Sequence, residues 1–298
     1  MRTLLILMVV FAYGFNVQCK QSPETNLQED SQTALTAIKP RSIVTLDEKV
    51  LETSGLIYFD NSFWTINDSG NENILYRVDS KSGLVVTEIT ITNAENVDWE
   101  ELTQDDSYVY IGDIGDNSLV RDEKQIYRLK KSEVSKIDKS GDLESEVIRF
   151  KYPDVEGKKI NFDAEAIISY DGSLHLFTKD FFVTNHFTIS TEPGVTTAKF
   201  VETYKSNGQV TGAAINAKDK TLVMIGYLGF GQRLLWEFKG FNANNLSKTA
   251  IRLFSLGAVN ETGQLEAICF NDDGHVFLSN ESFGGLKQQL WDVPYPAK

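Results

Sequence analysis

The chain has 298 residues, of which 41% are hydrophobic and 24% are charged. This balance excludes a disordered protein and supplies enough apolar material for one large core or two ordinary ones. The formal net charge of −13 argues against nucleic acid and anionic membranes as partners, because an acidic protein is repelled by their phosphate groups. Such acidity is common among secreted soluble proteins, and it leaves a divalent cation as a partner class.

The N-terminus is predicted to be an export signal that covers residues 1–18. An apolar run from Leu4 to Phe15 follows one positive charge, and this run is too short to span a bilayer comfortably. Cys19 comes directly afterwards and resembles the lipid-attachment cysteine of bacterial lipoproteins, although the three residues before it depart from the small-residue pattern of that site. We expect an exported protein of the cell envelope, lipid-anchored at Cys19 and facing the periplasm or the cell surface, with simple secretion as the alternative.

A polar segment separates this signal from the rest of the chain. Residues 19–40 begin with "CKQSPETNLQEDSQTALT", a composition that does not pack into a core. We therefore expect a flexible tether over 19–40 and a single folded domain over 41–298.

An internal repeat runs through that domain. Each copy is an apolar strand, a turn rich in Asp, Gly or Asn, and a second apolar strand, repeated about every fifty residues. The copies read "SGLIYFDNSFWTIND" from Ser54, "EELTQDDSYVYIGD" from Glu100, "EAIISYDGSLHLFTKD" from Glu165, "TGAAINAKDKTLVMIGY" from Thr211 and "EAICFNDDGHVFLSNE" from Glu266.

Two further strands follow most of these pairs. Third strands such as "LYRV", "IYRL" and "LWEF" are followed by fourth strands such as "VVTEITI", "SEVIRFKY" and "TAIRLFSL". Four strands per unit at this period are typical of a β-propeller, in which each unit forms one blade.

The fifth unit lacks a fourth strand, because the chain stops shortly after its third. The segment "RSIVTLDEKV", residues 41–50, precedes the first unit and belongs to no blade of its own. We expect it to complete the last blade and so remove an open sheet edge. The sequence thus predicts an all-β, five-bladed β-propeller; the alternative is six blades, one of them degenerate and built around the insertion "SEVSKIDKSGDL".

Small residues follow the leading residue of four units, where inner strands converge on the axis and bulk is not tolerated. They are Gly55, Ala166, Gly212 and Ala267. The second unit has Glu101 at this position, and the repeat gives no account of it.

The polar residues at the strand ends are predicted to meet at one rim of the propeller. First strands start and second strands end at the same edge, so distant carboxylates converge there and repel one another unless a cation or protons intervene. Oxygen ligands without cysteine or histidine suit calcium, and other divalent cations less readily. The predicted ligands are Asp68, Glu100, Asp113, Asp116, Glu165, Asp180, Glu266 and Glu281. The alternative is that each acid caps backbone amides of a neighbouring blade.

The stretch "IGDIGDN", residues 111–117, is the most unusual local feature. Its two glycines permit a close backbone approach, and its polar side chains offer several oxygens in one loop. The spacing is not that of an EF-hand. Arg121 is expected to hold one of these carboxylates or to meet an anionic ligand, and an ordinary acidic turn is the alternative.

The cysteine and histidine content predicts no zinc site. Cys269 lies inside the apolar stretch "LEAICF" and is expected to be a buried hydrophobe. His175 in a strand, His186 in a loop and His275 in a turn are expected to be structural.

Several motifs together resemble the SdiA-regulated and phytase-like β-propeller proteins of bacterial envelopes. They are "ETSGLIY", "WTINDSG", "NVDWEEL", "YIGDIGDN", "IYRL", "DAEAI" and "LFTKD", and the similarity covers most of 44–298. The family repeats an element close to Asp-x-Glu-Gly, which "DWEE" and "DAEA" match well and "QLEA" in part. The resemblance implies a propeller with calcium near its axis, but a shared fold does not transfer an activity.

These observations favour a binding module whose rim holds a divalent cation. Its expected partner is a small oxygen-rich ligand or an envelope protein, contacted through Asn117, Arg121, Lys179 and Tyr227. The chain is expected to be monomeric, to bind no nucleic acid and to meet a membrane only through its lipid anchor. The alternative is a metal-dependent hydrolase of esters, lactones or phosphoesters with Glu165 or Glu100 as general base. No catalytic motif decides whether it is an enzyme, and a scaffold without ligand is the third possibility.

Overall fold

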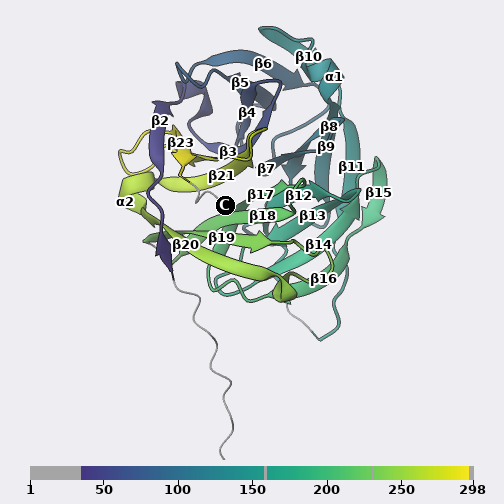
Figure 1. Cartoon of the computed structure of the whole chain (residues 1–298). Helices are drawn as coiled ribbons and strands as arrows, with labels where there is room; N and C mark the ends of the chain where they lie inside the picture. Colours follow the sequence, from purple (N-terminus) through teal and green to yellow (C-terminus); the bar gives the residue numbers. More distant parts are fainter. Residues whose placement is uncertain (1–34, 158–159, 230, 295–298) are drawn as a thin grey trace, which may run out of the picture. The chain divides into compact units, whose positions relative to one another are not determined.

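A computed structural model describes residues 35–157, 160–229 and 231–294. These residues form five small sheets arranged around a central axis, which is a five-bladed β-propeller (Figure 1). The predicted fold is confirmed, and the described residues contain no sixth blade. None of their helices is long and apolar enough to cross a membrane. The predicted signal and Cys19 lie outside the described residues.

Each blade has four antiparallel strands that follow one another outward from the axis, and short additional strands extend three of the sheets. The first blade is built from β3 (Thr53–Phe59), β4 (Ser62–Asn67), β5 (Ile74–Val78) and β6 (Val85–Ile91). The second is built from β7 (Trp99–Gln104), β8 (Tyr108–Asp113), β9 (Lys124–Lys130) and β11 (Glu146–Lys151). The third is built from β12 (Ala164–Tyr170), β13 (Ser173–Thr178), β14 (Thr184–Ser190) and β16 (Lys199–Tyr204).

The fourth and fifth blades follow the same order. The fourth is built from β17 (Gln209–Asn216), β18 (Thr221–Leu228), β19 (Gln232–Lys239) and β20 (Ala250–Ala258). The fifth is built from β21 (Gln264–Phe270), β22 (Val276–Glu281) and β23 (Gln289–Val293), with β2 (Arg41–Thr45) as its outer strand. Short helical turns are η1 (Glu48–Val50), α1 (Lys131–Val134), η2 (Leu246–Lys248) and α2 (Val259–Thr262).

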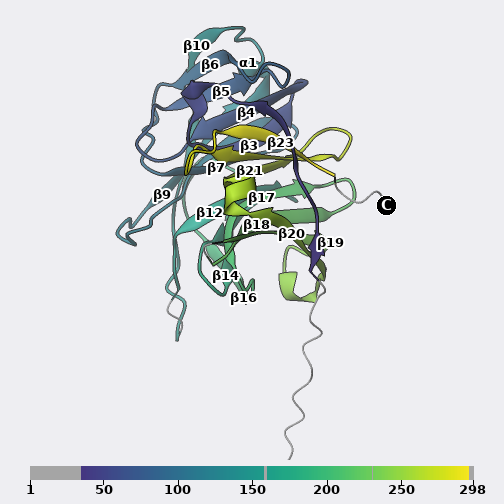
Figure 2. The ribbon, with the colours of Figure 1, turned by 90° about the vertical axis from the view of Figure 1, so that its left-hand side faces the viewer.

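The N-terminal strand closes the ring as predicted. Strand β2 pairs antiparallel with β23, with Arg41 opposite Asp292 and Thr45 opposite Gln289, and Figure 2 shows β2 passing beside the last blade. The pairing covers an edge of the last sheet that could otherwise pair with another chain.

Three short strands extend the blades and correct two expectations. Strand β10 (Ser140–Leu143), from the insertion, pairs parallel with β6 of the first blade, so the insertion widens that blade and forms no blade of its own. Strand β15 (Gly194–Thr197) extends the second blade in the same way. Strand β1 (Thr36–Ala37) pairs parallel with β20. The segment predicted as tether therefore joins the propeller before residue 41.

The hydrophobic core of the described residues is divided into five clusters, each between two successive blades. Trp64 of the first blade and Trp99 of the second, for example, share one cluster. Another joins Leu56 of the first blade to Cys269 of the last across the closure. Inner strands are therefore buried on both faces, which explains their continuous apolar runs.

Every inner strand has a β-bulge at the same place. The pairing with the second strand skips one residue in each blade. The skipped residues are Ser54, Glu100, Glu165, Thr211 and Glu266. They are the leading residues of the five repeats, and a bulge releases a side chain from the alternation between the two faces of a sheet.

Candidate functional site

The bulges bring acids that are far apart in the sequence into one electrostatic neighbourhood. The charge of Glu165 acts on Glu100, and that of Glu266 acts on both Glu165 and Glu281. We call the group at this mouth of the propeller the acidic rim: Asp68, Asp98, Glu100, Glu165, Glu266 and Glu281. The predicted convergence of the distant acids is therefore present.

Three carboxyl groups of this rim form a candidate cation site. Oxygen atoms of Asp68, Asp98 and Glu100 all lie within 4.8 Å of one another. Asp68 directly follows β4 of the first blade, and the other two flank Trp99 at the start of β7 in the second blade. The sequence interpretation included two of these ligands and missed Asp98. The signal was present, because the Asp-x-Glu spacing of "DWEE" places both carboxyls beside the bulge.

The environment of this site disfavours bare negative charge. Burial raises the pKa of Asp68 to about 6 and raises the pKa of Asp98. Burial, followed by the nearby charges of Glu165, Asp68 and Asp98, holds the pKa of Glu100 well above its ordinary value. Among the described residues, no lysine, arginine or backbone amide hydrogen-bonds to the carboxylates of Asp98 or Glu100. A cation would relieve this repulsion.

Gly115 explains why "IGDIGDN" contains a glycine at this position. A Cβ atom there would lie 2.1 Å from Oε1 of Glu100 and 2.6 Å from the carboxyl of Asp98. The amide of Gly115 also donates a hydrogen bond of 3.2 Å to the carbonyl of Asp98. The loop therefore packs directly on the acidic pair, which only a residue without a side chain permits.

The other acids of this loop are engaged locally. Asp116 accepts hydrogen bonds from the Lys124 ammonium at 2.6 Å and the Val120 amide at 2.8 Å. Burial raises its pKa, but the hydrogen bonds from Lys124 and from the amides of Val120 and Arg121 together outweigh that effect, and the pKa is lowered. Asp113 pairs with Arg121 at 2.7 Å, which confirms that Arg121 holds a carboxylate. Asp113 and Asp116 therefore lie outside the three-carboxylate cluster.

The remaining predicted residues of the loops divide in the same manner. Asn117 is exposed on the surface of its loop. Asp180 is half-buried and accepts a hydrogen bond of 2.6 Å from the amide of Phe181, so its carboxylate binds the backbone of its own loop. A role for Asp180 as a cation ligand stays a prediction.

Lys179 is the cation that the chain itself places in the rim. Its ammonium lies 2.5 Å from Oε1 of Glu165; burial lowers the pKa of Lys179, but Glu165 and Glu266 outweigh this and hold it well above its ordinary range. Burial raises the pKa of Glu165 to about 8 although Lys179 opposes this. Burial and the charges of Glu266 and Asp68 raise the pKa of Glu281 to about 9.

Hydroxyl groups connect the rim to neighbouring blades. Tyr227 donates to the Glu266 carboxylate, and its ring lies 4.0 Å from the Arg233 guanidinium carbon. Ser54 donates to the carbonyl of Trp99 at 3.0 Å, and Thr211 donates to that of Leu265 at 3.0 Å. At the two positions without an acid, the leading residue therefore binds the backbone of the next blade.

Glu101, which the repeat left unexplained, fills the axis. Its side chain is fully buried, and its carboxylate accepts hydrogen bonds from the amides of Leu102 at 3.0 Å and Ala213 at 2.9 Å. The amide of Leu56 also bonds to it, and burial holds its pKa well above the ordinary value. A Cβ atom on Gly212 would lie 3.2 Å from Oε2 of Glu101, so the glycine of the fourth blade makes room for one long carboxylate that joins three inner strands.

The histidines and Cys269 take no part in the rim. Cys269 is buried, as expected, and forms no disulfide with another described residue. His175 and His186 contact each other at 2.9 Å between Nδ1 and Nε2, and burial lowers the pKa of His186 to about 3. His186 lies in β14, not in the predicted loop. Both act as buried neutral side chains.

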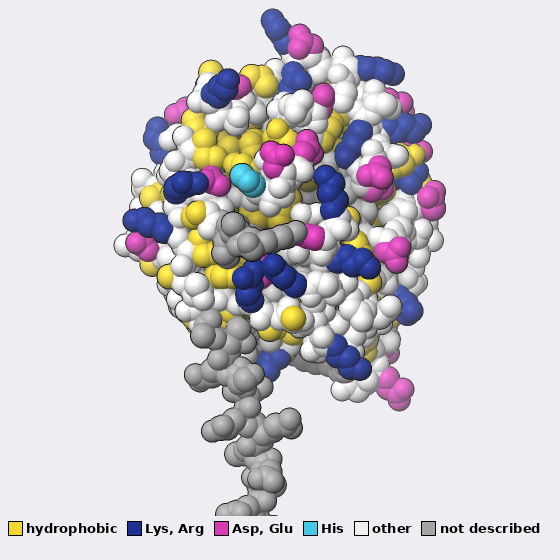
Figure 3. Space-filling model, viewed as in Figure 1, with side chains coloured by type: hydrophobic (Ala, Val, Ile, Leu, Met, Phe, Trp, Pro, Cys, Tyr) yellow, Lys and Arg dark blue, Asp and Glu magenta, His cyan; other side chains and the backbone are white. Residues whose placement is uncertain are grey.

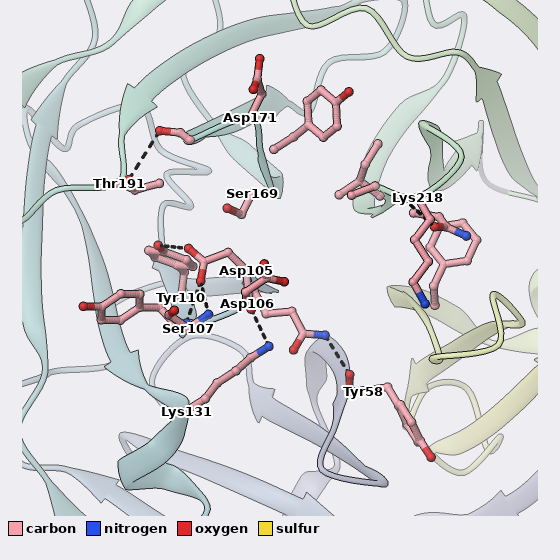
Figure 4. A pocket seen from close by; sticks show the side chains of 18 of the residues that line it. Tyr58, Asp105, Asp106, Ser107, Tyr110, Lys131, Ser169, Asp171, Thr191 and Lys218 are labelled. Atoms are coloured by element: carbon pink, nitrogen blue, oxygen red, sulfur yellow. Dashed lines mark hydrogen bonds between the residues drawn. The ribbon is translucent and has the colours of Figure 1, made fainter.

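The opposite mouth of the propeller holds a cavity of about 860 Å³. It lies where first strands end, and Figure 4 shows Tyr58, Asp105, Ser169 and Lys131 around it. Asp105 binds the Tyr110 hydroxyl at 2.6 Å, while its carbonyl accepts a bond from Lys131 at 2.5 Å. Acidic and basic side chains are interspersed with hydrophobic ones on the face in Figure 3. This cavity contains none of the predicted site residues.

The class that this architecture defines is the five-bladed β-propeller. No family model and no curated protein matches the sequence. Among solved structures, a PQQ-bound aldose sugar dehydrogenase from Streptomyces coelicolor has 13% identity and a TM-score of 0.48, over 86% of this chain and 97% of that one. A putative glucose dehydrogenase from Thermus thermophilus has 8% identity and a TM-score of 0.48, over 86% of this chain and 100% of that one. A putative 6-phosphogluconolactonase from Bacteroides uniformis has 9% identity and a TM-score of 0.40, over 82% of this chain and 68% of that one. Likenesses this low carry no argument about function.

Proposed function

We propose that this propeller is a binding module in which Asp68, Asp98 and Glu100 hold a divalent cation, calcium by preference. The observation that carries the proposal is the approach of three carboxyl oxygens to within 4.8 Å without a hydrogen-bonded lysine or arginine among them. Carboxylates brought together in a buried place repel one another, and a hard cation with oxygen ligands converts that repulsion into attraction.

The cation would also create the binding function. Calcium takes about six to eight oxygen ligands, and three carboxyl groups cannot fill such a shell by themselves. Water or an oxygen-rich ligand would fill the remaining positions of the ion. Lys179 and Tyr227, both at this mouth, are already bonded to Glu165 and Glu266, so they would shape the site and leave the free positions to the ion.

Calcium titration of chelator-treated protein by calorimetry tests the proposal. We expect one binding event for the wild type and its loss in Asp98→Asn and Glu100→Gln. Asp142→Asn is the matched control, because this exposed aspartate lies on the outer strand β10. Calcium at a hundredfold excess over its Kd should stabilise the fold by about 3 kcal/mol. A wild type without binding heat or thermal shift at millimolar calcium would assign the acids to a structural role.

A metal-dependent hydrolase is the second candidate, and the state of Glu165 favours it. Its pKa of about 8 is near the value that suits a general base at neutral pH. A panel of lactone, aryl ester and phosphoester substrates tests this with Glu165→Gln, and with Glu144→Gln as an exposed control. Hydrolysis that Glu165→Gln leaves unchanged would remove Glu165 from the base role.

We further propose, from the motifs quoted above, that the chain belongs with the SdiA-regulated and phytase-like envelope propellers and is exported. Lipid attachment at Cys19 is measurable by mass spectrometry of the protein purified from membranes. Cys19→Ala should release it into the soluble fraction.

A further inference from the structure

Exposed hydrophobic side chains gather around the acidic rim. They lie in or beside two kinds of loop: those between the second and third strands of a blade, and those between the fourth strand of one blade and the first strand of the next. Both kinds of loop emerge at the rim end of the blades. Val120, Phe182 and Phe181 are the most exposed, at 77%, 72% and 60%. We call the set the apolar ring: Leu51, Val97, Leu119, Val120, Phe181, Phe182, Leu228 and Phe283.

The distribution is one-sided. The other exposed large hydrophobic side chains of the described residues are Leu35, Ile43, Leu84, Val86 and Val195. Leu35 precedes β1, Ile43, Val86 and Val195 lie on outer strands, and Leu84 lies in the turn between the third and fourth strands of the first blade. None of them belongs to a turn between first and second strands at the opposite mouth. Scattered exposed hydrophobic residues are ordinary, but a set confined to one functional face marks an interaction surface.

The apolar ring and the acidic rim are built by the same loops. Val97 directly precedes Asp98, and Phe181 follows Lys179 by two positions. In the fourth and fifth blades, Leu228 follows Tyr227 and Phe283 follows Glu281 by two positions. A partner that covers the ring would enclose the carboxyl groups and exclude water from them, and charge interactions strengthen when water is excluded.

We propose that this face docks a protein partner through a lysine or arginine flanked by apolar side chains. The apolar residues would cover the ring, and the basic group would enter the rim, where carboxyl groups outnumber the single lysine. Lys179 is an example within the chain of a basic group bound by this rim, because its ammonium lies 2.5 Å from Oε1 of Glu165. The inference places a protein partner on the same face as the binding role proposed above, but it does not need the cation.

Charge complementarity selects a protein over a lipid surface. Aromatic loop tips also insert into membranes, but anionic headgroups would be repelled by an acidic centre on a chain of net charge −13. A basic group between apolar residues satisfies both parts of the face at once, and buried hydrophobic anchors around a desolvated charge pair are typical of strong contact sites.

Selection of random displayed peptides against the whole chain tests the proposal. We expect enriched peptides to contain lysine or arginine between apolar residues. Their affinity should fall about tenfold or more in Phe181→Ser/Phe182→Ser, because burial of one such side chain contributes more than about 1.4 kcal/mol. Val195→Ser is the matched control, since it is 75% exposed on the outer strand β15, and it should bind as the wild type does.

The outcomes separate the alternatives. The proposal would be overturned if no peptides are enriched, if the enriched peptides are acidic, or if the double serine variant binds them as the wild type does. Binding of the wild type to anionic or zwitterionic vesicles that the double serine variant abolishes would also overturn it. Each peptide is measured with calcium and with chelator. If calcium fails to bind while peptides bind as expected, the cation site fails alone.

Discussion

Replacement of Glu101 by alanine tests whether the axis depends on a buried carboxylate. Three backbone amides, of Leu102, Ala213 and Leu56, donate hydrogen bonds to this side chain. The side chain is fully buried, so its removal leaves these donors without an acceptor on the axis. An unsatisfied buried N–H group costs about 1–3 kcal/mol, so three of them would cost about 3–9 kcal/mol.

Water that enters the vacated space would satisfy some of these donors, so we expect a loss of at least about 3 kcal/mol. That is a large share of the roughly 5–15 kcal/mol that stabilise a typical domain. Glu101→Gln keeps one acceptor and carries no charge, so it should lose less than the alanine variant. Glu101→Leu restores volume without an acceptor and should stay close to alanine.

Urea unfolding followed by tryptophan fluorescence measures these effects, since Trp64, Trp99 and Trp236 are buried. A lower midpoint at constant slope reports a loss of stability. Glu144→Gln, an exposed carboxylate, serves as the control. A Glu101→Leu variant as stable as the wild type would show that Glu101 acts by filling space. A Glu101→Ala variant with unchanged stability would refute the reasoning altogether.

Three further predictions concern the rim. Burial raises the pKa of Asp68 to about 6 in the folded protein, so the folded state binds this proton more tightly than the unfolded state does. The resulting stability is complete below the ordinary pKa of 3.8 and is lost as the pH rises through about 6. The effect amounts to about 3 kcal/mol. Chelator-treated protein should therefore melt lower at pH 7 than at pH 5, and the thermal shift given by calcium should grow over the same interval; a calcium shift independent of pH would contradict this. Gly115→Ala should abolish calcium binding, which calorimetry measures, because its methyl group would lie 2.1 Å from Oε1 of Glu100. Gly157→Ala is the control: no atom lies near its Cβ position, although its positive φ makes the substitution strained. Unaltered calcium affinity in Gly115→Ala would show that the loop moves freely. Lys179→Met should destabilise the fold by about 3 kcal/mol, because it leaves Glu165 buried without its partner. In thermal melts, lower pH should restore part of this stability, because it protonates Glu165. A variant as stable as the wild type at pH 8 would contradict the pairing.

The blade architecture was readable from the sequence because its signals are local. Apolar runs such as "GLIYF" and "AIISY", bounded by turn residues, recur at a regular period, and each blade needs only its own segment to form hydrogen bonds between consecutive strands. The closing strand at 41–45 was predictable by elimination, since one unit lacked a strand and one strand lacked a unit. Strand β1 was missed because two residues have too little pattern to be recognised.

The candidate site was only partly readable. Glu100, Glu165 and Glu266 could be grouped because the repeat aligns them, and the structure places them together. Asp113 and Asp116 looked equivalent to ligands in the sequence, yet each has found a basic partner, Arg121 or Lys124. Whether an acid is free or paired depends on side-chain distances across the loop, which composition and spacing do not encode.

By itself the sequence determined the propeller architecture, the order of the strands within a blade and the set of residues that lead the repeats, because these depend on periodicity and on neighbours in the chain. It left the number of blades between five and six, and the structure decided it by pairing the insertion with the first blade. Only the tertiary structure decided which acids share an oxygen cluster, that Asp98 completes it, and that Glu101 spans the axis. Those outcomes depend on five bulges and on contacts between segments more than a hundred residues apart, such as Glu101 with Ala213, and such contacts exist only once the ring is closed.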